Sequence, residues 1–166
     1  MMDYYSKKGI LEVLDMAEKL PDTIHLFILG SGIEESKVIE LSNRKMNIHF
    51  IGYQNREKTL EIIASSDLLI QPSRIEGGLS YTLLESMACG LPVVTTKHSD
   101  SFSEITDEAV VFVENDPQEF SKIFKKIISD SEYKEKLISK SLKIAKLIGG
   151  DSMESKELEL YQKYIK

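Results

Sequence analysis

Short, uninterrupted apolar runs alternate with helix-length amphipathic segments along most of this chain. Continuous apolar runs of this kind are typical of strands covered on both faces, as in a parallel sheet. Strands joined by helices form βαβ units, which build such a sheet. The sequence therefore predicts an α/β fold, a parallel sheet with helices on both faces. The predicted strands are 24–29, 48–51, 68–71, 93–95 and 110–113.

Helical periodicity occupies the segments between these runs. The clearest stripe joins Phe120, Ile123, Phe124, Ile127 and Ile128. Gly149-Gly150 is the one break that resembles a linker. We assign a single domain to residues 1–148 and a C-terminal helical extension to 149–166. The predicted helices are 8–20, 34–46, 55–65, 81–89, 117–129, 132–148 and 152–165.

Composition excludes several classes of protein. The formal net charge of −6 argues against a dedicated nucleic-acid binder, although a local pocket can still attract a small anion. The one cysteine, Cys89, allows no internal disulfide and no cysteine zinc site. No apolar stretch approaches the roughly 18 residues of a membrane span, and residues 1–8 lack a signal-peptide core. We expect a cytoplasmic protein.

Three loops follow the carboxyl ends of predicted strands, where open parallel sheets bind ligands. They are 30–32, 52–55 and 72–80. The third carries Arg74, Glu76 and the pair Gly77-Gly78 just before a helix. Glycines at a helix N-terminus let backbone N–H groups approach an anion, and the helix dipole favours negative charge. This loop predicts a diphosphate site.

Two carboxylates flank that predicted anion site. Glu85 lies about one and a half turns into the helix, where it can accept two hydrogen bonds from a vicinal diol such as ribose. Glu76, in the loop, can reach a second set of hydroxyls. Two carboxylates suit a diphosphate that carries a sugar on each side.

Each of these features also has a structural interpretation. Gly77-Gly78 can be an ordinary turn, Glu85 a surface helix residue and Arg74 a solvated charge. Gly30-Ser31-Gly32 lacks the third glycine of a dinucleotide fingerprint. The three histidines lie at or beside strands and are expected to be structural. The chain contains no Asp-x-Asp pair, which argues against the metal-dependent single-domain class of glycosyltransferase.

Taken together, the segments resemble the C-terminal domain of the family-4 retaining glycosyltransferases, one Rossmann-like half of the GT-B architecture. The resemblance is collinear over about residues 7–140, and its most specific part is Glu85 to Val94. The matching segments are Lys8-Gly9, Leu26 to Gly32, Phe50 to Tyr53, Ser66 to Ser73, Glu76-Gly77, Leu83 to Val94 and Asn115-Asp116-Pro117.

The resemblance implies that a longer protein transfers a sugar from a nucleoside-diphosphate sugar to an acceptor hydroxyl with retention. Lys8, with the amides of Gly78, Leu79 and Ser80, would stabilise the leaving diphosphate. Glu85 would hold the ribose, and Glu76 the donor sugar or the leaving group. The remaining donor-binding residues would be Gly30, Gly32, Tyr53, Gln54, Arg74 and Gly77, with Tyr53 and Gln54 bordering the base pocket. The scheme needs no metal and no cofactor.

Three departures from the family pattern bear on this expectation. Eight residues separate Glu76 from Glu85, where the family usually has seven. The family's first strand, with a Gly-Arg before the lysine, is absent, as is the N-terminal acceptor-binding domain. We expect an excised or truncated donor domain that binds a nucleoside diphosphate weakly and transfers no sugar alone. Any peripheral membrane contact would lie in the absent domain.

Two other function classes remain open. One is a GT-B relative that epimerises or hydrolyses a nucleotide sugar, which would need an internal acid–base group that no His or Asp here supplies well. The other is a non-catalytic nucleotide-binding module. The sequence does not name the nucleotide, the sugar or the acceptor.

Overall fold

Alternating strands and helices form the fold, as the apolar runs predict. The computed structural model describes residues 9–72, 80–96, 108–114 and 116–148, so the predicted helix 152–165 and the C-terminal extension lie outside the described residues. The strands are β1 (Leu26–Leu29), β2 (Ile48–Gly52), β3 (Leu69–Gln71), β4 (Val93–Thr96) and β5 (Val111–Val113). The helices are α1 (Ile10–Glu18), α2 (Glu35–Arg44), α3 (Arg56–Ala64), α4 (Tyr81–Ala88), α5 (Pro117–Ser129) and α6 (Ser131–Ile148).

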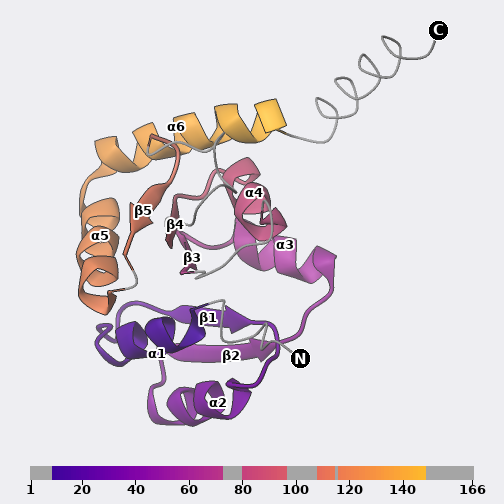
Figure 1. Cartoon of the computed structure of the whole chain (residues 1–166), viewed down its shortest axis with the longest axis vertical. Helices are drawn as coiled ribbons and strands as arrows, with labels where there is room; N and C mark the ends of the chain where they lie inside the picture. The colour runs from indigo at the N-terminus through magenta and orange to yellow at the C-terminus, as the bar shows by residue number, and fades with distance from the viewer. Residues whose placement is uncertain (1–8, 73–79, 97–107, 115, 149–166) are drawn as a thin grey trace, which may run out of the picture.

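Every strand pair in the described residues is parallel, which confirms the predicted sheet type. β1 pairs with β2, while β3, β4 and β5 form a second sheet in that order. The sequence predicts one sheet, and the described strands instead form two, because β1 and β3 are not hydrogen bonded to each other. Figure 1 shows the two-stranded part below the three-stranded part.

Helices cover both faces of the three-stranded part, again as predicted. Successive side chains of a strand point to opposite faces. Val94 packs in one cluster with Val13 of α1 and Phe120 of α5. Its neighbour Val93 packs in another with Met87 of α4 and Ala145 of α6. The two faces of β4 are therefore covered by different helix pairs.

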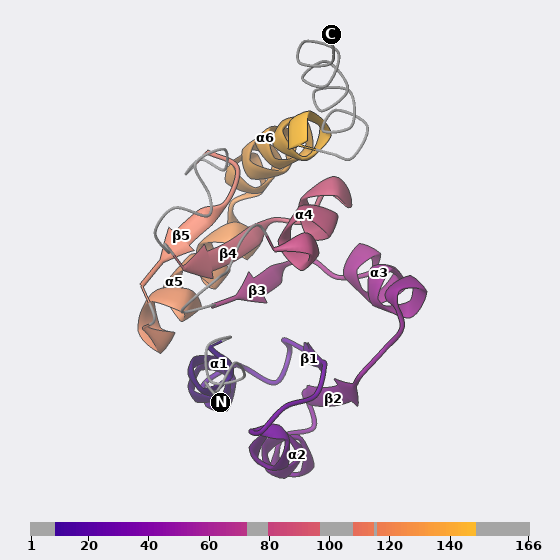
Figure 2. The same cartoon turned by 45° about the vertical axis from the view of Figure 1, so that its right-hand side comes forward.

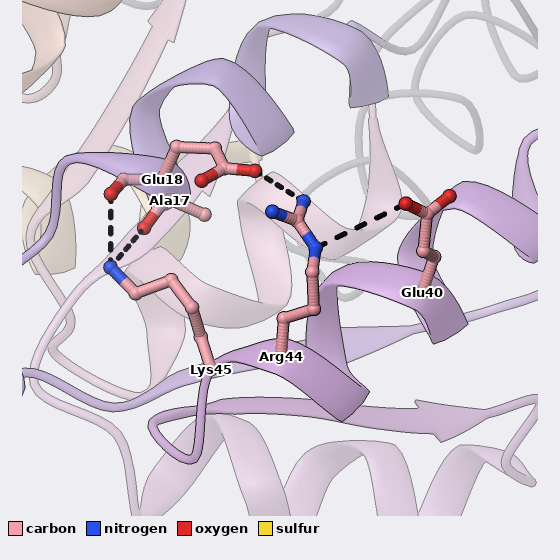
Figure 3. Close-up of polar contacts among 5 residues, drawn as sticks. All are labelled: Ala17, Glu18, Glu40, Arg44 and Lys45. Carbon is pink, nitrogen blue, oxygen red and sulfur yellow. Dashed lines mark hydrogen bonds and ion pairs between the residues drawn. The ribbon is translucent and has the colours of Figure 1, made fainter.

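Side chains from the end of α2 hold the end of α1 (Figure 3). Lys45 donates through Nζ to the carbonyl oxygens of Ala17, Glu18 and Leu20 at 3.2, 3.0 and 3.0 Å. A cation at a helix C-terminus satisfies carbonyl groups that have no partner within the helix. Arg44 adds an ion pair with Glu18. These contacts fix α1 against α2 beside the two-stranded part. In the described residues, no helix is both long and apolar enough to cross a membrane.

Candidate functional site

The carboxyl ends of β1 and β2 meet at two glycines. The N–H of Gly30 donates to the carbonyl oxygen of Gly52 at 2.9 Å. Both residues have positive φ, 110° for Gly30 and 70° for Gly52, which side chains with a Cβ rarely adopt. The two turns therefore leave the same edge of the sheet together, as the sequence predicts for the loops 30–32 and 52–55.

Tyr53 and Gln54 follow Gly52 at this edge. Tyr53 is 78% exposed, so a planar ligand can reach its ring. Gln54 is half-buried and donates through Nε2 to the carbonyl oxygen of Ile51 at 3.0 Å, which fixes the turn. That these two residues border a base pocket stays a prediction.

The N-terminus of α4 is held against the end of β3. The amide of Gln71 donates to the hydroxyl of Ser80 at 2.8 Å, and the hydroxyl lies 3.1 Å from the amide oxygen of Gln71. The hydroxyl of Thr95 donates to the carbonyl oxygen of Gln71 at 2.9 Å. The buried hydroxyl of Ser80 is thus hydrogen bonded to Gln71, and the Ser80 side chain does not cap α4. A helix N-terminus favours negative charge, and the predicted diphosphate site at α4 stays a prediction.

Gly9 brings the start of α1 against the same strand end. It has φ 70°, and a Cβ placed on it would lie 1.8 Å from the carbonyl oxygen of Pro72. Only glycine allows both this conformation and this approach. The start of α1 and the entry to the loop after β3 are therefore in direct contact.

Glu85 faces a cation from a neighbouring helix. The Nε and Nη2 atoms of Arg56, the first residue of α3, each lie 3.1 Å from Oε1 of Glu85. The Glu85 side chain is 20% exposed and that of Arg56 is 80% exposed. An ion pair so open to water contributes about 0–1 kcal/mol to stability. Glu85 is therefore a partly buried, oriented carboxylate.

A cavity of ≈ 670 Å³ gathers several predicted residues. Gly30, Gly32 and Ser80 line it, together with Gln71 and Pro72 at the end of β3. Glu85, Tyr53 and Gln54 do not belong to its described lining. The other predicted residues, Lys8, Arg74, Glu76, Gly77, Gly78 and Leu79, lie outside the described residues. Within the described ranges, no group of three His, Cys, Asp or Glu side chains could hold a metal ion.

Sequence reasoning missed Arg56. A cation at the first position of a helix is unfavourable next to the positive end of the helix dipole. Its presence there was the one sequence signal that Arg56 has a partner elsewhere in the fold. Asn55 caps the helix in the usual way, its side chain accepting from the N–H of Lys58 at 2.8 Å. Arg56 is thus free to turn toward Glu85, which the sequence separates from it by 29 positions.

Comparisons with known proteins agree with this architecture. An uncharacterised glycosyltransferase of Methanocaldococcus jannaschii is 27% identical over 76% of this chain and 34% of its own length. A GDP-mannose-dependent mannosyltransferase of Corynebacterium glutamicum, acting on a monoacylated phosphatidylinositol monomannoside, is 28% identical over 66% of this chain and 31% of its own. The chain therefore spans about a third of the length of these relatives.

Solved structures share the fold at low identity. Anabaena HepE in complex with UDP superposes with a TM-score of 0.81 at 16% identity, covering 99% of this chain and 48% of HepE. The C-terminal domain of a group 1 glycosyl transferase from Francisella tularensis gives a TM-score of 0.71 at 23% identity, covering 86% of this chain and 80% of that domain. The family model described as glycosyl transferases group 1 matches residues 3–143, and the chain belongs to that family.

Proposed function

We propose that this chain is the donor-binding part of a longer glycosyltransferase that moves a sugar from a nucleoside-diphosphate sugar to an acceptor hydroxyl with retention. The observation that carries the proposal is the oriented Glu85 carboxylate on α4, whose N-terminus is fixed beside β3. The class of donor is supported by HepE, solved with UDP, with UDP and glucose, and with UDP-glucose, and by the GDP-mannose named for the mannosyltransferase.

In the proposed site, Glu85 accepts hydrogen bonds from the ribose hydroxyls. The first-turn amides of α4, with the loop residues Gly77 to Ser80, hold the diphosphate as its charge develops in the transition state. Lys8 and Arg74 add positive charge there. Glu76 holds the donor sugar or orients the leaving group. The turns at Gly30, Gly32 and Tyr53-Gln54 complete the donor pocket.

Three further features belong to the proposal. The reaction needs no metal, because fixed backbone amides and cations neutralise the leaving group. The protein works in the cytoplasm, where nucleotide sugars are the donors for polysaccharide or glycoconjugate synthesis. A separate acceptor-binding domain completes the cleft, so the chain alone binds a nucleoside diphosphate weakly and transfers nothing. The relatives reported above carry glycosyltransferase names, and no observation favours an epimerase, a hydrolase or a non-catalytic module.

Calorimetry of the chain with UDP, GDP and inorganic phosphate tests the binding claim. We expect weak but measurable binding of a nucleoside diphosphate and none of phosphate alone at the same concentration. A donor-turnover assay on the same chain should show no transfer. Robust transfer by the chain alone would refute the proposed division of the enzyme into two parts.

Replacing Glu85 with Gln tests the site itself. The carboxylate accepts two hydrogen bonds from a diol, whereas the amide offers one acceptor and one donor. Charge-assisted hydrogen bonds contribute about 1.5–3 kcal/mol, so the donor KM of the longer enzyme should rise roughly 10- to 100-fold. Glu76→Gln should lower kcat more than it raises KM, if Glu76 acts on the transition state.

Two controls sharpen this test. Glu57→Gln removes an exposed carboxylate on α3, one residue from Arg56, and should leave the donor KM within about twofold. Arg56→Ala frees Glu85 from its partner and should raise the donor KM by no more than about fivefold, because the exposed pair contributes at most about 1 kcal/mol. An unchanged KM for Glu85→Gln would remove the residue-level support for the site.

A further inference from the structure

The carboxylate of Glu85 is held through one of its two oxygens. Nε of Arg56 donates to Oε1 at 3.1 Å, and Nη2 of Arg56 lies 3.1 Å from the same atom. No hydrogen bond reaches Oε2 from the residues that the structure describes. Each carboxylate oxygen offers about two acceptor sites. Oε1 therefore faces the protein's own cation, and Oε2 is left for a ligand.

Glu85 needs this support because its own helix fixes only its backbone. The next two residues on α4, Ser86 and Met87, are both 0% exposed. A glutamate side chain has many rotamers, and holding it in one of them costs conformational entropy. The core around α4 therefore places the backbone of Glu85, while the carboxylate has to be oriented by another group.

The turn before α3 presents Arg56 from a fixed backbone. Asn55 caps α3, its side chain accepting from the N–H of Lys58 at 2.8 Å. Gln54 donates to the carbonyl oxygen of Ile51 at 3.0 Å, which braces the other end of the turn. Figure 2 shows α3 beside α4, so the side chain of Arg56 reaches from one helix to the next.

Stability alone gives a weak reason for an arginine at this position. The Arg56 side chain is 80% exposed, and an ion pair so open to water contributes little to folding. A cation in the first turn of a helix is also unfavourable beside the helix dipole. The guanidinium is, however, a planar fork that donates several N–H groups with little loss of freedom. Such a group suits the orientation of a carboxylate better than the stabilisation of the fold.

We propose that Arg56 is a positioning residue of the donor site, which holds Oε1 of Glu85 so that Oε2 accepts from the ribose hydroxyls. Arg56 acts through Glu85 and makes no contact with the donor. The pair, and not Glu85 alone, therefore sets the preference of the site for ribose over deoxyribose. This inference rests on the proposed function, because that function assigns the ribose to Glu85.

Ribose selectivity tests this role, because general damage to the site would weaken the binding of every nucleotide alike. UDP and GDP are first titrated into the chain with NMR detection, and the tighter binder is kept. Its Kd is then compared with the Kd of its 2′-deoxy form, which has one hydroxyl fewer for Glu85. We expect Arg56→Ala to raise the Kd of the ribose form about two- to fivefold and that of the deoxy form by less than about twofold.

Lys58→Ala is the matched control for the loss of a cation from α3. Lys58 pairs with Glu61 at 2.6 Å and has no contact with Glu85. This variant should leave the ratio of the two Kd values unchanged. Melting curves of both variants check their folding, which the loss of an exposed side chain should not disturb.

The outcomes separate this inference from the proposed function. Equal weakening of the two nucleotides by Arg56→Ala would overturn the inference, because Arg56 would then act on a part of the ligand that both share. An unchanged or lower Kd for the ribose form would overturn it too, since Arg56 would then be idle or compete with the ribose. A parent chain that binds neither UDP nor GDP, or that binds the ribose and deoxyribose forms alike, would contradict the proposed function itself and this inference with it.

Discussion

β4 and β1 are both parallel strands of four residues, yet they differ in burial. All four residues of β4 are buried, with Val93 at 0% and Val94 at 1% exposure. No residue of β1 falls in the buried class, and Phe27 is 47% exposed. β4 has a strand on each edge and a helix pair on each face, while β1 has one paired edge.

The comparison shows that an apolar run predicts a strand more reliably than it predicts burial. Burial depends on how many neighbours the fold places around the strand. The part built on β3–β5 is closed by α4 and α6 on one face and by α1 and α5 on the other. The part built on β1 and β2 borders the cavity, so its residues have room to relax.

A matched pair of leucines gives the largest expected effect. Leu83 of α4 is 0% exposed in the cluster around β4, and Leu41 of α2 is 2% exposed beside the two-stranded part. Leu83→Ala should lower the free energy of unfolding by about 3–5 kcal/mol and Leu41→Ala by about 2–3 kcal/mol. The loss is smaller for Leu41 because its surroundings can move into the space that the missing side chain leaves. Urea unfolding of the two variants measures both. Equal costs, or a larger cost for Leu41→Ala, would contradict the comparison.

The join between the two parts gives the next largest effect. Gly9→Ala places a Cβ against the carbonyl oxygen of Pro72 in a conformation that side chains avoid. The left-handed conformation costs about 1–2 kcal/mol and overpacking about 1–3 kcal/mol, so we expect a loss of about 2–5 kcal/mol. Urea unfolding curves give this loss directly.

Gly90→Ala is the control for backbone strain. Gly90 has φ 74°, close to that of Gly9, but its added Cβ would meet only a side-chain atom of Ile138 at an ordinary 3.6 Å. Gly90→Ala should therefore lower the free energy of unfolding only by the cost of the left-handed conformation, about 1–2 kcal/mol. If the two variants lose the same amount, the contact between α1 and β3 does not hold the parts together.

Much of this fold could be predicted from sequence because its signals are local. The apolar runs located the five strands of the described residues, and the stripe from Phe120 to Ile128 located α5. Asn55 and Asp116 cap their helices with side-chain bonds, which short-range patterns can anticipate.

The remainder depends on contacts between distant segments. The Arg56–Glu85 pair, the approach of Gly9 to Pro72 and the cavity between β1 and β3 all arise from tertiary placement. No local pattern encodes them. The sequence predicted a donor site at the carboxyl edge with Gly30, Ser80 and Glu85, and that site stays a prediction. It did not show that Glu85 has a partner, and Lys8 and Glu76 stay predictions.

Helix α6 allows the effect of burial to be measured one contact at a time. The hydroxyl of Ser141, which is 0% exposed, donates to the carbonyl oxygen of Ala109. Ser141→Ala leaves that carbonyl without its donor in the core, so the loss should be about 1–3 kcal/mol. Thermal melting reports it. Ser141→Thr is the matched variant that keeps the hydroxyl, and a loss as large as that of Ser141→Ala would indicate that packing and not the hydrogen bond matters.

The neighbouring contact on α6 should give the smallest effect. Lys140 donates through Nζ to Oε2 of Glu108 at 2.6 Å, one residue from the Ser141 contact on each side, and both side chains are open to water. This hydrogen bond, and then the charge of Lys140, lower the pKa of the Glu108 carboxyl below its ordinary value of 4.5. Because folding lowers this pKa, the ion pair stabilises the folded chain at pH values above the pKa of Glu108 in the unfolded chain. That stabilisation is lost as the pH falls through the pKa of Glu108 in the folded chain.

Water screens the pair, so Glu108→Gln should lower Tm at neutral pH by less than about 2 °C. That difference should shrink in melting curves recorded at progressively lower pH, because the Glu108 carboxylate then becomes protonated in the parent chain as well. A Tm loss for Glu108→Gln as large as that for Ser141→Ala would show that exposure does not rank these two adjacent contacts.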